Sequence, residues 1–268
     1  MTAPGIADLL GIRDWPGFVL VSARVAGLFL VEPLWSMTAV PKTVRGAVAV
    51  VLSVVLLPTI HPVTALPDDM VAMAMVLAGE TLFGVAMGMI GAFLLQGVVI
   101  AGEVASLQMG LSLGQALGSL PEGATVGVGQ LQGYFAMSIY LILGGHLALY
   151  QALAASFATV PAGQAVRGIG GGREIVDLAG AVFSGGIRAA APVLVALLLA
   201  HVALAILGKA VPQLNVMMVS FPVTISIGLV AFGATLPFLG AFLSATVGAI
   251  PEQVAGVVQA FRTAAQVR

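Results

Sequence analysis

The sequence contains little charge and no cysteine. Only 8% of its 268 residues are Asp, Glu, Lys or Arg, and the net charge is −1. Without cysteine, disulfides, thiolate metal sites and cysteine nucleophiles are excluded, and no basic face is available for nucleic acid. Apolar residues make up 60% of the chain, and the mean hydropathy is +1.12. Soluble domains have about 45–50% apolar and about 25% charged residues, so the composition predicts an integral membrane protein.

Motifs for catalysis are also missing. The sequence has no Walker loop, HExxH, nucleophile elbow or dinucleotide fingerprint. The glycine run at 168–172 lacks the strand-to-helix setting of a phosphate-binding loop. Three histidines, His61, His146 and His201, lie in separate segments. We therefore expect neither an enzyme nor a cofactor or metal site.

Long apolar runs separated by turn signals predict helices throughout. A spanning helix needs about 20 mostly apolar residues. Turns are indicated at His61-Pro62 and at Pro67-Asp68-Asp69. The tail after Pro251 has apolar residues at helical spacing. Hydropathy counts about six spans, near 18–34, 44–60, 70–105, 129–159, 175–207 and 216–243, the last interrupted by Pro222 and Pro237.

The basic residues between these runs do not assign an orientation. With six spans, one side of the membrane would collect Lys42, Arg45 and Lys209. The other side would collect five arginines, namely Arg13, Arg167, Arg173, Arg262 and Arg268. An excess of Lys and Arg normally marks the cytoplasmic side. Because neither side is clearly favoured, we expect a chain that does not cross the bilayer as a simple serpentine.

Several ionisable side chains interrupt the apolar runs. Such groups usually face a protein partner or a water-filled cavity. They predict either an ion or proton path or buried structural pairs. Arg24 could pair with Glu32, two turns further along the same helix, or with a residue of another helix. The candidates are Arg24, Glu32, Glu80, Glu103, His146, Arg188 and His201.

Small residues recur every four positions in the long apolar segment that begins at Met70. Gly84, Gly88 and Ala92 form one such row. Rows of this kind let helix backbones approach closely. The row predicts helix packing, either within the chain or against other subunits.

The segment 108–123 is too polar and too rich in glycine for a lipid-facing helix. Irregular backbone at membrane depth is tolerated only inside protein or along a cavity. The segment therefore predicts a loop that lines or blocks a pore, with an ordinary surface connector as the alternative. Its candidate residues are Gln108, Met109, Gly110, Leu111, Gly114, Gln115, Gly118 and Pro121.

A series of short motifs runs along the chain: Arg24, Pro33, Val40-Pro41-Lys42, Pro58, Ala101-Gly102-Glu103, Leu107-Gln108-Met109-Gly110-Leu111-Ser112, Gly145-His146-Leu147, Pro161-Ala162-Gly163, Ala191-Pro192-Val193, Val211-Pro212-Gln213-Leu214-Asn215-Val216 and Phe221-Pro222. In order and spacing this series resembles the FliR family of flagellar export-gate subunits, whose counterpart serves virulence type III secretion. Two departures occur: Leu120 precedes Pro121 where the family often has Asp, and Val223-Thr224 stands where several members have a Lys.

The resemblance implies an all-α fold of integral membrane helical hairpins. A FliP-like part at 1–180 would be fused to a FliQ-like hairpin at 181–268, followed by the amphipathic tail. The segment 108–123 would contribute to a plug in the closed channel. The turn of the hairpin is expected at Pro212, Gln213 and Asn215, because these residues interrupt the helical pattern between two apolar runs.

The same resemblance implies a non-enzymatic subunit of the flagellar type III protein export gate, in the bacterial inner membrane at the basal body. Its partners would be FliP-like, FliQ-like and FlhB-like subunits, membrane lipid and exported unfolded proteins. A virulence secretion subunit and a structural membrane scaffold are the nearest alternatives. A proton-coupled small-solute transporter using Glu32, Glu80 or Glu103 is less favoured, because the two halves show no internal repeat with matching broken helices.

Overall fold

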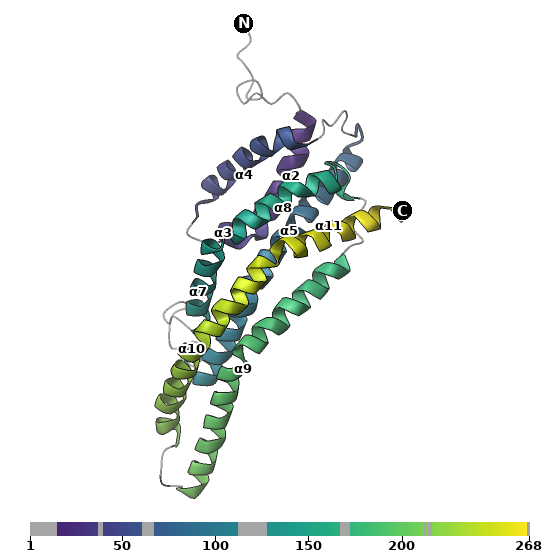
Figure 1. Cartoon of the computed structure of the whole chain (residues 1–268). Helices are drawn as coiled ribbons and strands as arrows, with labels where there is room; N and C mark the ends of the chain where they lie inside the picture. Colours follow the sequence, from purple (N-terminus) through teal and green to yellow (C-terminus); the bar gives the residue numbers. More distant parts are fainter. Residues whose placement is uncertain are drawn as a thin grey trace. The chain divides into compact units, whose positions relative to one another are not determined.

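The computed structural model describes residues 15–36, 40–60, 67–111, 128–166, 172–211, 213 and 216–266. Within these ranges the regular secondary structure is entirely helical (Figure 1), which confirms the all-α prediction. The helices are α2 (Trp15–Val31), α3 (Pro33–Ser36), α4 (Lys42–Leu56), the short 3-10 helix η1 (Leu57–Thr59), α5 (Met70–Met109), α7 (Val128–Ile142), α8 (Gly145–Thr159), α9 (Gly172–Ala210), α10 (Val216–Gly248) and α11 (Ile250–Gln266).

The chain folds into two compact units that share helix α5. Unit 1 contains residues 1–92, 144–179 and 248–268, and unit 2 contains residues 93–143 and 180–247. Each unit is thus assembled from stretches far apart in sequence. The boundaries between the units fall at 92/93, 143/144, 179/180 and 247/248.

Three helices are long and apolar enough to cross a membrane. They are α5, the stretch Ala190–Ala210 of α9, and the stretch Met218–Gly248 of α10. The bent pair α7 and α8 would make a fourth span if it crosses as one. The expected count of about six was too high for the described residues, because α2 and α4 have only 17 and 15 residues and a span needs about 20.

Two helices occupy the segment 129–159, where the apolar pattern predicted one. Helices α7 and α8 meet at a bend of 56°. Gly144 lies at this bend with φ +71°, in the left-handed region. Glycine adopts this conformation without a steric penalty because it lacks a Cβ atom. The prediction of a single helix was wrong because hydropathy does not register such a bend.

Proline does not interrupt α9 or α10. The helices continue through Pro192, Pro222 and Pro237, although Pro222 and Pro237 had been expected to break the last apolar run. Proline removes one backbone donor, but hydroxyl side chains can satisfy the carbonyls that it frees in a membrane helix.

The start of α5 and the whole of α11 follow their sequence signals. The Asp69 carboxylate accepts a hydrogen bond from the Ala72 backbone N–H at 3.0 Å and thereby caps α5. In α11 the apolar residues at helical spacing face the interior of unit 1, and the Phe261 ring packs against the Phe83 ring of α5 at 4.7 Å. The buried residues of α11 are Ile250, Val254, Val257, Val258 and Phe261.

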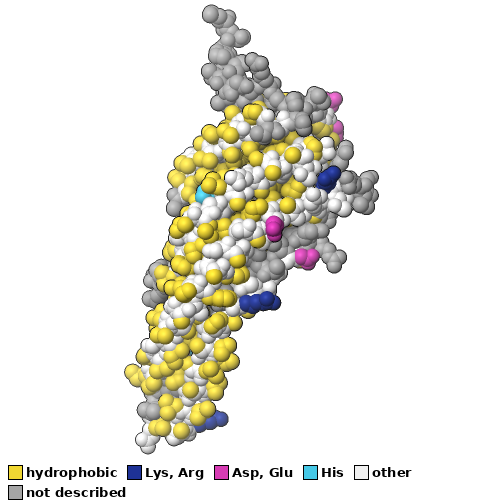
Figure 2. Space-filling view, in the orientation of Figure 1, with side chains coloured by type: hydrophobic (Ala, Val, Ile, Leu, Met, Phe, Trp, Pro, Cys, Tyr) yellow, Lys and Arg dark blue, Asp and Glu magenta, His cyan; other side chains and the backbone are white. Residues whose placement is uncertain are grey.

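Unit 2 has an apolar core and a large apolar exterior. Its core contains Ala105 and Met109 of α5 with Val193 and Leu197 of α9. Only 28% of the α9 span and 17% of the α10 span is buried. Apolar side chains cover much of the visible surface of the described residues, and charged side chains are few (Figure 2). Such helices need lipid or other protein around them.

Candidate functional site

Helices α2 and α5 of unit 1 approach each other along glycines. A Cβ atom at Gly27 would collide with the Thr81 carbonyl oxygen, and one at Gly84 would collide with the Arg24 carbonyl oxygen. At Gly88 it would lie 2.8 Å from the Leu28 carbonyl oxygen. The row Gly84–Gly88 thus packs against a helix of the same chain, which is the first of the two alternatives that the sequence left open.

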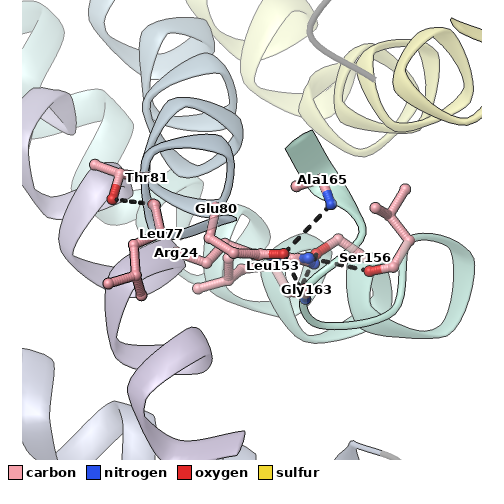
Figure 3. Close-up of polar contacts among 9 residues, drawn as sticks. Arg24, Leu77, Glu80, Thr81, Leu153, Ser156, Gly163 and Ala165 are labelled. Atoms are coloured by element: carbon pink, nitrogen blue, oxygen red, sulfur yellow. Dashed lines mark hydrogen bonds and ion pairs between the residues drawn. The ribbon is translucent and has the colours of Figure 1, made fainter. Parts of the chain in front are cut away.

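This close approach brings Arg24 into the interior, where each of its three guanidinium nitrogens donates a hydrogen bond (Figure 3). The Nε atom donates to Glu80 Oε2 at 2.7 Å. The Nη1 atom donates to Ser156 Oγ of α8 at 3.0 Å, and Nη2 donates to the Val160 carbonyl oxygen at 3.0 Å. Arg24 therefore connects α2 with α5, with α8 and with the residue that follows α8.

The Glu80 carboxylate is bonded through both of its oxygens. While Oε2 accepts from Arg24, Oε1 accepts from the backbone N–H of Gly163 at 2.8 Å and of Ala165 at 3.4 Å. Gly163 has φ +88°, a conformation that favours glycine. The turn after α8 is thereby folded back onto α5.

Aromatic rings complete the surroundings of the Arg24 guanidinium. Its Cζ atom lies 4.0 Å from the centre of the Phe157 ring and 4.7 Å from the centre of the Phe83 ring. A cation this close to an aromatic ring is attracted by the negative face of the ring. The side chains of Arg24 and Glu80 are both 0% exposed. The network therefore satisfies a buried ion pair internally and has the character of a structural clamp.

A second polar cluster lies at the junction of α2 and α3. The Trp35 indole Nε1–H donates to the Tyr150 hydroxyl at 2.6 Å. The Phe29 ring stacks on Trp35 at 4.8 Å, and His146 meets the edge of Tyr150 at 6.1 Å. The Glu32 side chain is buried, and the Glu32 carbonyl oxygen accepts a hydrogen bond from the Trp35 backbone N–H at 3.2 Å. Glu32 thus belongs to this cluster, while Arg24 pairs with Glu80.

The remaining candidate charges lie in unit 2 and are exposed. Glu103 of α5 and Arg188 of α9 both face outward, as does His201. No ion pair joins any of them to a described residue. Unit 2 therefore presents a carboxylate and a guanidinium on otherwise apolar helices, where a partner or water must solvate them.

The residues that flank the candidate pore loop are described, but most of the loop lies outside the described residues. Before the loop, Gln108 and Met109 end α5, and Gly110 and Leu111 form the turn that follows. On the far side, Gly129 of α7 packs against α5, where a Cβ atom would lie 2.6 Å from Glu103 Cγ. The loop candidates Gly114, Gln115, Gly118 and Pro121 lie outside the described residues. In the expected hairpin turn, Gln213 is described and exposed, whereas Pro212 and Asn215 lie outside the described residues.

The described residues offer little for small-molecule chemistry. Within these ranges, no group of three or more His, Asp or Glu side chains is arranged to hold a metal ion. A groove of about 300 Å³ lies between α8 and α11 of unit 1 and carries no charged side chain. Its lining is mostly small or apolar: Ala148, Gln151, Ala152, Ala155, Ser156, Thr159, Pro251, Val254, Ala255 and Val258.

Sequence reasoning missed several members of the network. Nothing in the pattern indicated Ser156, Phe83 or Phe157 as partners of Arg24. Gly163 was noted only as part of the Pro161-Ala162-Gly163 motif, and its role emerges from the N–H bond to Glu80. The N–H donors of a buried arginine each need an acceptor. The position of Arg24 in an apolar run therefore indicated that it has several polar partners, but not which residues they are.

These features define an all-helical membrane protein in which the buried Arg24 and Glu80 are bonded to each other. The chain belongs to the bacterial export proteins, family 1, because the model of that family matches residues 15–250. It is 26% identical over 233 residues to the flagellar biosynthetic protein FliR of Escherichia coli (strain K12), which covers 87% of each chain. It is 29% identical over 219 residues to FliR of Bacillus subtilis (strain 168), covering 81% of this chain and 84% of that one. The resemblance noted in the motifs is thereby confirmed.

Proposed function

We propose that this chain is a non-enzymatic subunit of the flagellar type III protein export gate and forms part of the channel wall. The observation that carries the proposal is the family match over residues 15–250 together with the similarity to flagellar FliR proteins. The flagellar system is favoured over a virulence system because these relatives are named as flagellar proteins. The chain would act in the inner membrane at the basal body, on unfolded protein substrates.

The exterior of unit 2 supports a role inside an assembly. The apolar spans of α9 and α10 are mostly unburied, and Glu103 and Arg188 lie exposed on the helices of this unit. Charged groups on such helices face protein or water more often than lipid. FliP-like, FliQ-like and FlhB-like subunits would cover these helices, and lipid would cover the rest.

The interior of unit 1 supports a structural role over proton-coupled transport. Transport through Glu80 would require this carboxylate to release Arg24 and two backbone N–H groups. Such a release leaves buried charge uncompensated, which costs several kcal/mol, about 3–5. The Arg24–Glu80 pair, with both carboxylate oxygens hydrogen-bonded, therefore suits a channel wall that stays fixed.

Within the gate, we propose that the segment 108–123 contributes to the plug of the closed channel, and that 181–268 forms the FliQ-like hairpin. The test replaces residues 112–120 with a glycine–serine sequence of equal length, so that Leu111 and the connection to α7 remain. The replacement should raise ion leakage through the closed gate in vesicles that contain the whole complex. Unchanged leakage in a fully assembled complex would contradict the plug.

Membership of the gate has its own test. The tagged chain is purified in mild detergent from cells that also express FliP-like and FliQ-like subunits. We expect the three proteins to elute as one complex. A chain that elutes alone, folded and without these partners would overturn the proposed function.

A further inference from the structure

Helix α4 of unit 1 leaves most of its surface uncovered. It packs along α2 of the same unit (Figure 1), and of its 15 residues only Ser53 and Leu56 are buried. The Ser53 hydroxyl donates to the Ala49 carbonyl oxygen at 2.7 Å, one turn earlier in the same helix. The buried side of α4 is therefore satisfied within the chain, and its other sides face whatever surrounds the protein.

An apolar stripe runs along the exposed side of α4. Val44, Val51 and Val55 are 46%, 61% and 63% exposed. Their spacing of seven and four residues places these valines on one face of the helix. At about 100° per residue, Ser53 lies on the opposite side, so the stripe points away from the buried face. An exposed apolar face of this kind marks a surface that contacts a membrane or another protein.

The first turn of α4 carries positive charge without a counter-charge. It contains Lys42 and Arg45, and it has no acidic residue. Cations are unfavourable at this end of a helix, because the helix dipole has its positive pole there. Among the described residues, no carboxylate forms an ion pair with either side chain. The buried Nε atom of Arg45 also has no acceptor among them, so the charge of this turn calls for an anion from outside the chain.

The composition of α4 favours a membrane over a protein as its cover. The helix contains no aromatic residue, and one of its two charged residues is a lysine. Protein interfaces are enriched in aromatic residues and depleted in lysine. Helices that lie in the membrane surface instead place apolar side chains among the acyl chains and Lys or Arg near the phosphates. With 15 residues, α4 is also too short to cross a bilayer, which takes about 20.

We propose that α4 lies in the membrane surface and binds anionic phospholipid. Val44, Val51 and Val55 insert among the acyl chains, while Lys42 and Arg45 bind the headgroup phosphates. Long cationic side chains reach the phosphate layer in this way while their apolar stems stay in contact with lipid. A phosphate oxygen then supplies the Arg45 guanidinium with the acceptor that the described residues do not provide. This inference goes beyond the proposed export function and does not rest on it.

Contact with lipid is tested by fluorescence quenching in the assembled complex. Because the chain has no cysteine, Val51→Cys or Val55→Cys gives one site in it for a bimane label, which is attached before assembly. The vesicles contain phosphatidylcholine with brominated acyl chains, which quench the label on contact. The control is Gly46→Cys on the opposite side of α4, where nothing lies within 4 Å of an added Cβ atom. We expect strong quenching at 51 and 55 and weak quenching at 46.

The headgroup preference is measured with the label at Val44→Cys, next to the basic turn. The readout is the ratio of quenching by brominated phosphatidylglycerol to quenching by brominated phosphatidylcholine at equal mole fraction. Lys42→Gln with Arg45→Gln should lower the preference for phosphatidylglycerol roughly 5- to 30-fold, the factor expected for two cations at an anionic membrane. Lys42→Arg with Arg45→Lys keeps both charges and should keep the preference. The matched control, Lys209→Gln with Arg262→Gln, removes two cations from α9 and α11 and should change nothing at this label.

Three results would overturn the proposal. Weak quenching at 46, 51 and 55 alike would mean that another subunit covers α4, and equally strong quenching at all three would mean that lipid surrounds the helix. An unchanged headgroup preference in Lys42→Gln with Arg45→Gln, or an equal fall in the matched control, would remove the phosphate site. If the chain forms no complex with FliP-like and FliQ-like subunits, the export-gate proposal is wrong, and the same ratio measured on the full chain alone in vesicles still decides the lipid site.

Discussion

In unit 1, Arg24 and Glu80 are fully buried and bonded to each other, whereas in unit 2 Glu103 and Arg188 are exposed on apolar helices. The buried pair is satisfied by atoms of the same unit, including the Ser156 hydroxyl. The exposed pair of charges depends on whatever surrounds unit 2. The difference indicates that unit 1 satisfies its buried charges internally, whereas the charges of unit 2 need solvation from outside the chain.

The same contrast holds for the packing of the helices. In unit 1, α2 and α5 meet through backbone contacts at Gly27 and Gly84, and the amphipathic α11 buries its apolar face. In unit 2, the spans of α9 and α10 bury little of their surface. Without a hydrophobic driving force in lipid, helices associate through close packing and polar contacts. The described helices of unit 1 are thus packed more closely on one another than the spans of α9 and α10 in unit 2.

The largest effect should follow from breaking the clamp in unit 1. Glu80→Ala leaves the Arg24 guanidinium buried without its counter-charge and removes the acceptor of the Gly163 and Ala165 N–H groups. We expect a loss of about 3–5 kcal/mol of unfolding free energy, measured by thermal unfolding of the detergent-purified chain. The double variant Arg24→Met with Glu80→Leu should be less damaging than Glu80→Ala. Equal stability of Glu80→Ala and the unmodified chain would contradict the clamp.

A smaller effect should come from the helix contact that places the clamp. Gly84→Ala puts a methyl group against the Arg24 carbonyl oxygen, so we expect about 1–3 kcal/mol of destabilisation from overpacking. The control is Gly46→Ala on α4, where nothing lies within 4 Å of the new atom. That change should be neutral or stabilising by about 0.5–1 kcal/mol, because alanine is the better helix former. Similar melting temperatures for the two variants would mean that α2 and α5 are not in close contact.

The smallest effect should be found at the exposed charges of unit 2. Glu103→Gln and Arg188→Gln remove a charge that has no ion-pair partner among the described residues. In the isolated chain we expect a change of about 0.5 kcal/mol or less in unfolding free energy. Thermal unfolding beside Glu80→Gln provides the direct comparison. A loss at Glu103 as large as that at Glu80 would remove the distinction between the two units.

Several parts of the fold were predictable from local pattern. Apolar runs with few charges indicated membrane helices, and the turn signal at Pro67-Asp68-Asp69 indicated that a new segment begins near Met70. The spacing of Val254, Val257, Val258 and Phe261 indicated the buried face of α11. These predictions succeeded because hydropathy, capping and amphipathic spacing act within a few residues of each other along the chain.

Other parts could not be obtained in this way. The sequence left Arg24 with two kinds of partner, and the distance of 56 residues to Glu80 gave no reason to join them. One helix was predicted where Gly144 bends α7 against α8. Breaks were predicted at Pro222 and Pro237, which lie inside α10. The pairing of Arg24 depends on which helices meet in space, and the bend at Gly144 depends on a backbone conformation that hydropathy does not report.

The sequence by itself determined that this chain is helical, that it requires an apolar environment, and that it belongs to an export family. Composition, periodicity and motif order are sufficient for these conclusions because they depend on neighbours in sequence. The tertiary structure decided which carboxylate neutralises Arg24 and that the glycine row packs within the chain. Which buried polar groups pair depends on which helices pack together, and local sequence patterns do not indicate that packing.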